Sequence, residues 1–172
     1  AVGDLAETLE RRIGPVAIAY NLTGVDNLQL KPATLAKIFA GKVAKWDDAA
    51  IQADNPGVKL PATTIQAVHR SDESGTTDNF TAFLSTGAKG SDGVASAVKQ
   101  ADGAIGYVEW SYAENSALKT AKIGNGAGEF AALTAESAGK AVAGAKLTGE
   151  GDDLRMSIDY NTKEAGAYPI VL

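Results

Sequence analysis

The sequence predicts an α/β domain in which a mainly parallel central sheet is flanked by helices. Short apolar runs that predict buried strands alternate along the chain with segments of helical spacing. The chain contains 19 glycines but only 6% aromatic residues, and small residues allow helices to lie close to a sheet. A length of 172 residues suits one domain with its own hydrophobic core.

The first half of the chain supplies two of the expected strands. Residues 16–22 and 64–69 are compact apolar runs flanked by turn-forming residues, as in buried strands. Pro32 is suited to a helix start and Gly41 to a helix end. Asn55-Pro56-Gly57 predicts a turn. The helices expected in this half span residues 1–13, 32–41 and 46–51.

The second half continues the alternation of helices and strands. Val94 and Val98 have the spacing of an inward helix face, and Thr134 opens a capping pattern. Asp102-Gly103 and Asn125-Gly126 predict turns. The helices expected in this half span residues 74–84, 91–100, 110–115 and 134–145, and the strands span residues 104–108, 119–123, 154–158 and 168–172.

Composition and charge exclude several kinds of partner and site. The formal net charge is −5, and the lysines and arginines form no basic run, so we expect no nucleic-acid partner. Cysteine is absent, which excludes disulfides and thiolate metal sites, and we expect neither a metal nor a cofactor. An anionic ligand remains compatible with the acidic total, because backbone N–H groups and one arginine act over a few ångströms.

The segment from Arg70 to Thr77 is the candidate ligand site, because it joins a predicted strand to a predicted helix. Ligands of open α/β sheets bind at the carboxyl ends of strands, where helix N-termini present unpaired N–H groups and a positive dipole end. Ser74, Gly75 and Thr76 would form the first helical turn and donate to an oxyanion, with Gly75 allowing close approach.

Arg70 and Asp72 complete this candidate site. The forked guanidinium of Arg70 suits a tetrahedral oxyanion, and Asp72 is placed to orient that guanidinium or to cap the helix. From the pattern alone, a polar turn with an ordinary helix cap and a surface arginine explains the segment equally well. The segment is not a P-loop, because the Gly-Lys-Ser/Thr ending is missing.

A family resemblance favours phosphate as the ligand. The sequence RSDESGTTDNF at 70–80 resembles the signature of the phosphate-binding subunit of the phosphate ABC transporter. Other matching segments occur in the expected order, so the resemblance covers residues 14–172. These segments are VAIAYNL at 16–22, LAKIFAG at 35–41, GAIGYVE at 103–109 and GAYPIVL at 166–172.

The resemblance implies the second lobe of a type II periplasmic-binding-protein fold. In that family phosphate lies between two lobes, and the matching positions here are Arg70, Ser74, Gly75 and Thr76, with Asp72 as the arginine-orienting residue. The family's first lobe begins with a Gly-Ala-Gly-Ala-Thr-Phe-type loop and supplies a serine and an aspartate that excludes sulfate. The sequence lacks these motifs. We therefore expect half of an interlobe phosphate site.

The same resemblance implies the organisation and surroundings of the protein. We expect an N-terminal amphipathic segment near the hinge at residues 1–13 and a lobe at 14–172 that is truncated at its C-terminus. The expected partners are inorganic phosphate, the missing first lobe and an ABC permease. The expected location is extracellular, cell-surface or periplasmic, with the exporting signal outside this chain.

Two other classes of function stay open at this stage. One is an enzyme with a phosphate-ester site, such as a phosphatase, and the other is a self-associating interaction module with exposed hinge strands. A Ser-His-Asp hydrolase is disfavoured, because His69 is the single histidine and no nucleophile elbow is present. We expect a structural role for His69, core packing for Trp46 and Trp110, and no catalysis.

Overall fold

The fold is seen in a computed structural model, which describes residues 14–70, 87–88, 90–147, 156–157, 159 and 161–171. A five-stranded sheet forms its centre, in the order β4-β3-β5-β1-β6. The strands are β1 (Val16–Asn21), β3 (Gln66–Arg70), β4 (Gly87–Ala88), β5 (Ala104–Glu109) and β6 (Lys119–Thr120). The strand β3 is parallel to β4 and β5, whereas β1 is antiparallel to β5 and β6. The predicted mainly parallel sheet is thus confirmed, with β1 as its reversed strand.

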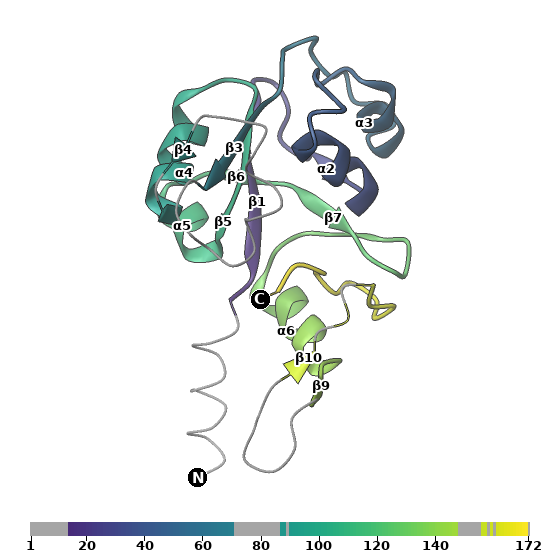
Figure 1. Ribbon diagram of the computed structural model, residues 1–172. Helices are drawn as coiled ribbons and strands as arrows, with labels where there is room; N and C mark the ends of the chain where they lie inside the picture. The colour runs from purple at the N-terminus through teal and green to yellow at the C-terminus, as the bar shows by residue number, and fades with distance from the viewer. Residues whose placement is uncertain are drawn as a thin grey trace.

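Helix α4 (Gly90–Gln100) covers one face of this sheet and contacts β1, β3 and β5 (Figure 1). Val94 and Val98 are fully buried on its inner face, as predicted. The close approach requires Gly106 in β5, because an added Cβ would lie 2.8 Å from Val94 Cγ1 and 3.0 Å from Val98 Cγ2. A glycine on the sheet therefore sets the depth at which α4 packs.

A second layer of the fold is built on a three-stranded sheet. Its strands are β2 (Gln29–Leu30), β7 (Lys122–Gly124) and β8 (Phe130–Ala131). Helices α2 (Pro32–Phe39) and α3 (Ala49–Asp54) lie beside it (Figure 1). Buried Asp54 accepts a hydrogen bond from Lys31 N at 2.9 Å, and Asn55 exchanges hydrogen bonds with the backbone of Gln29. These hydrogen bonds connect the end of α3 to the segment that precedes α2.

The remaining described elements are α5 (Trp110–Asn115), α6 (Ala135–Ala143) and the strand pair β9 (Lys146–Leu147) and β10 (Met156–Ser157). Thr134 and Ser137 form a reciprocal capping box at the start of α6, as the sequence predicted. Residues 161–171, named here the 161–171 strap, then contact the turn between β7 and β8 and reach the start of β1. No helix within the described ranges is both long and apolar enough to span a bilayer.

Most predicted elements in the described ranges are confirmed to within about two residues, but a helix at 46–51 and a single strand at 119–123 were wrong. The helix expected at 46–51 begins at Ala49, because Asp48 Oδ1 accepts a hydrogen bond from Ala50 N and caps it there. The strand expected at 119–123 is two strands, since the chain leaves β1 at Ala121 and pairs with β2 instead. The helices predicted at 1–13 and 74–84 lie outside the described residues.

The strand predicted at the end of the chain is also corrected. Tyr168 to Val171 form no strand, and their ladder contact is an isolated bridge between Val171 and Pro15. The backbone N–H of Tyr168 instead donates to Ser137 O at 2.9 Å, and Pro169 has no N–H to donate. Of the strand expected at 154–158, Met156 and Ser157 are seen as β10.

Candidate functional site

Arg70, the predicted charged contact to phosphate, is the last residue of β3. It lies opposite Ala88 in the parallel ladder between β3 and β4, while β5 flanks β3 on the other side. The carboxyl ends of three parallel strands therefore meet at this edge of the sheet, where ligands of open α/β sheets bind. Asp72, Ser74, Gly75 and Thr76, the other predicted site residues, lie outside the described residues, and their roles stay predictions.

Helix α4 begins at the edge of the sheet where β3 ends. The strand β4 ends at Ala88, and α4 starts at Gly90, which has a positive φ of 67°. The positive end of the α4 dipole is consequently close to the end of β4, the neighbour of β3. Asp92 in the first turn of α4 offsets part of this positive potential.

His69 directly precedes Arg70 and is buried, with 2% of its surface exposed. Its ring is 5.5 Å from the ring of Phe39, with an angle of 79° between the two planes. Phe39 also contacts Tyr107 of β5, with the ring centres 5.8 Å apart. Burial lowers the pKa of His69 below its usual value of 6.5, so the imidazole is neutral at pH 7. His69 therefore adds no charge beside Arg70.

The other candidates from the sequence have packing or capping roles. Trp46 is fully buried, and its Nε1 donates to Gly103 O at 3.0 Å, which confirms the expected core role. Trp110 packs half-buried against the core. Asp48 caps α3 through its Oδ1. Among the described residues, no group of three or more His, Cys, Asp or Glu side chains could hold a metal ion.

Phe39 and Tyr107 are the residues near the candidate site that sequence reasoning missed. Phe39 lies on α2, far from Arg70 in sequence, and nothing in its spacing indicates contact with β3. Tyr107 was predicted within a strand, but its ring contact depends on which face of the sheet α2 approaches.

The profile of the PBP superfamily domain matches residues 12–172. The chain belongs to the PBP superfamily. Among curated members, phosphate-binding protein PstS 3 of Mycobacterium leprae is 44% identical over 193 residues, covering 99% of this chain and 52% of that protein. The chain therefore spans about half the length of the curated relatives that it matches. These relatives confirm the resemblance to phosphate-binding subunits inferred from the motifs.

Solved PBP structures show that the fold is shared. A high-affinity periplasmic phosphate-binding protein (PfluDING), bound with phosphate, superposes with a TM-score of 0.63 at 20% identity, covering 92% of this chain and 54% of that one. A putative phosphate ABC transporter substrate-binding protein from Clostridium perfringens gives a TM-score of 0.51 at 23% identity, covering 64% and 45%. Both support the predicted single lobe of a periplasmic-binding-protein fold.

Proposed function

We propose that this chain provides half of a phosphate site, in which Arg70 contacts the anion with its charged fork. The observation that carries the proposal is the position of Arg70 at the carboxyl end of β3, beside the start of α4. In the proposed site Ser74, Gly75 and Thr76 donate neutral hydrogen bonds, and Asp72 orients the guanidinium. Phosphate binding by the 44% identical relative supports the choice of ligand.

The function is solute capture rather than catalysis in this proposal. The protein of which this sequence is part binds phosphate outside the cytoplasm and delivers it to an ABC permease. The support is the periplasmic location in the name of one structural neighbour and the ABC transporter in the name of another. A site that holds an anion through N–H donors and arginine needs no catalytic group.

The second half of the site belongs to a first lobe, which has no counterpart in the motifs of this sequence. If that lobe supplies about four hydrogen bonds of roughly 1.5 kcal/mol each, its loss costs about 6 kcal/mol of binding free energy. This is about ten-thousand-fold in affinity, which converts a micromolar site into one near ~10 mM. We expect sulfate to compete at similar concentrations, because the sulfate-excluding aspartate belongs to the first lobe.

The test is a phosphate titration followed by NMR chemical shifts at constant ionic strength. We expect saturable shifts with a dissociation constant near ~10 mM, and at least about tenfold weaker binding in Arg70→Ala, since a hydrogen bond to a charged group contributes roughly 1.5–3 kcal/mol. Arg70→Lys keeps the charge but removes the fork and should fall between the two.

Lys59→Ala is the matched control. Lys59 is exposed in the loop before β3, and its removal changes the net charge by the same amount as Arg70→Ala. Binding in Lys59→Ala should equal that of the unchanged chain. Equal weakening in both variants would mean that general charge, not an arginine site, holds phosphate, and the proposal would be wrong.

A further inference from the structure

Three rings form a layer beneath the end of β3, named here the aromatic layer and consisting of Phe39, His69 and Tyr107. The ring of Phe39 contacts the other two edge-on, at 5.5 Å and 5.8 Å between centres. His69 is 2% exposed and Phe39 is 7% exposed. Edge-on contact at these distances is the favoured geometry of aromatic pairs, so the arrangement is well packed.

The strand register places His69 and Tyr107 side by side. Val68 is opposite Gly106 in the parallel ladder, so the next residues on the two strands are His69 and Tyr107. Val68 and Gly106 belong to the α4 side, because a Cβ on Gly106 would meet Val94 and Val98 of that helix. Since successive side chains alternate between faces, His69 and Tyr107 face away from α4, toward Phe39.

The aromatic layer thus contacts β3 at its penultimate residue, His69, on the face opposite α4. The contact comes from Phe39, the final residue of α2, which belongs to the neighbouring layer of the fold. His69 immediately precedes Arg70, and its buried ring, packed edge-on against Phe39, restrains the backbone from which Arg70 departs.

We propose that Phe39, His69 and Tyr107 are positioning residues that hold the carboxyl end of β3, and with it Arg70, in the geometry that binds phosphate. This inference rests on the proposed function. It adds that ring packing, rather than imidazole charge, is what His69 contributes. The lowered pKa of His69 agrees with this role, because burial keeps the ring neutral. A displaced strand end misaligns the arginine fork, and a small misplacement of a binding group weakens binding markedly.

The experiment compares the dissociation constant for inorganic phosphate with the melting temperature in the full chain. Phe39→Leu keeps an apolar side chain but removes the ring. We expect phosphate binding to weaken about five- to tenfold at temperatures where the variant is fully folded. His69→Phe and Tyr107→Phe keep all three rings and should bind within about twofold of the unchanged chain, whereas His69→Ala should weaken binding like Phe39→Leu.

Ile123→Val is the matched control, because Ile123 is fully buried in β7 of the other sheet. It should lower the melting temperature without changing phosphate affinity. If Phe39→Leu and Ile123→Val bind phosphate equally well, or if His69→Phe binds as poorly as His69→Ala, the positioning role is contradicted. If Arg70→Ala binds as well as the unchanged chain, the proposed phosphate site itself fails, which is a separate outcome.

Discussion

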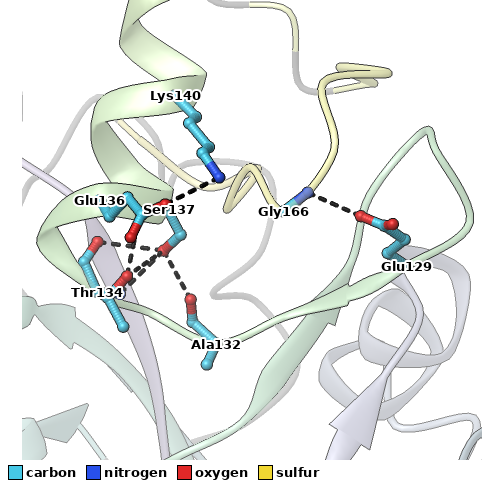
Figure 2. Close-up of polar contacts among 7 residues, drawn as sticks. All are labelled: Glu129, Ala132, Thr134, Glu136, Ser137, Lys140 and Gly166. Carbon is cyan, nitrogen blue, oxygen red and sulfur yellow. Dashed lines mark hydrogen bonds and ion pairs between the residues drawn. The ribbon is translucent and has the colours of Figure 1, made fainter.

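The central sheet and the 161–171 strap are stabilised by different interactions. In the sheet, β1 and β5 pair over six residues each, and Ala17, Ala19, Ala104 and Ile105 are fully buried. The strap has no strand or helix. It is held instead by hydrogen bonds such as Gly126 N to Thr162 O at 2.8 Å. Another joins Gly166 N to Glu129 Oε2 at 2.7 Å (Figure 2).

This difference predicts how far a local change spreads. Apolar burial in the sheet is shared by many neighbours, so a cavity there weakens the whole fold. A hydrogen bond at the strap joins two segments, and its loss frees those segments while the sheet stays folded. Figure 2 shows the start of α6, where Lys140 is paired to Glu136 at 3.0 Å and Ser137 Oγ donates to Ala132 O. The strap joins this helix through Tyr168 N, which donates to Ser137 O at 2.9 Å.

The largest effect is expected from Ile105→Ala in the middle of β5. Ile105 is fully buried, and removing its side chain leaves a cavity, so the free energy of unfolding should fall by about 3 kcal/mol. Urea denaturation followed by the fluorescence of buried Trp46 measures this. Ile65→Ala deletes the same atoms from a half-buried position, so it should lower the free energy of unfolding clearly less than Ile105→Ala does. Equal costs would mean that burial does not determine the stability of the sheet.

Gly126→Ala is expected to break the strap without breaking the sheet. The added Cβ would lie 2.8 Å from Thr162 O, and the backbone of Asn161 blocks the same space. We expect a loss of about 2 kcal/mol, as for other overpacking substitutions. Hydrogen exchange should accelerate at residues 162–168 and stay unchanged in β1 and β5. Uniform acceleration in both regions would contradict the contrast between them.

Tyr168→Phe tests the buried hydroxyl that links the strap to β1. Tyr168 is fully buried, and its hydroxyl donates to Val16 O at 2.8 Å. Its loss should cost about 1 kcal/mol, the net value of one hydrogen bond. Denaturant midpoints at pH 7 give this value directly.

The pH dependence of the same variant follows from the tyrosine pKa. Burial raises the pKa of Tyr168 far above its usual value of 10, so only the unfolded chain loses this proton near pH 10. The contribution of Tyr168 to the free energy of unfolding is therefore fully present below pH 10, and it is lost as the pH rises above 10. Tyr168→Phe should show a shallower alkaline loss than the unchanged chain. The slope that remains comes partly from Tyr20, whose pKa burial also raises.

The smallest effect, and the only gain among these variants, is expected from Gly139→Ala. Gly139 lies inside α6, and an added Cβ would meet nothing within 4 Å. Alanine should stabilise the helix by about 0.5–1 kcal/mol, because glycine loses more backbone entropy on folding. A small rise in melting temperature would show this. A loss of stability would mean that α6 packs more closely than its surroundings indicate.

The sequence predicted the long strands β1 and β5 and the starts of α2 and α6 well, because their signals are local. The apolar runs at 16–22 and 104–108, Pro32 and the Thr134 capping pattern each determine structure through immediate neighbours. The strap was predicted wrongly as a strand at 168–172, since its conformation depends on Ser137 and Val16, which are distant in sequence. Hydrogen bonds between such distant positions leave no periodic pattern.

The candidate site was predictable to a similar extent. The position of Arg70 at the end of a strand follows from the run that precedes it, and the structure confirms that position. The contact of Phe39 with His69 was not predictable, because it requires the relative placement of two layers. The ligand roles of Asp72, Ser74, Gly75 and Thr76 come from family resemblance alone and stay predictions.

The bridge between Pro15 and Val171 has a kinetic consequence. It joins positions at nearly opposite ends of the sequence, and Val16 N donates to Ile170 O at 3.0 Å beside it. Closing this loop costs more entropy than closing the shorter loops that join β1, β3 and β5, so we expect the bridge to form after the ladders of those strands. Interactions made late in folding mainly slow unfolding when they are strengthened. We therefore expect a stronger junction between the strap and β1 to slow unfolding more than it speeds folding.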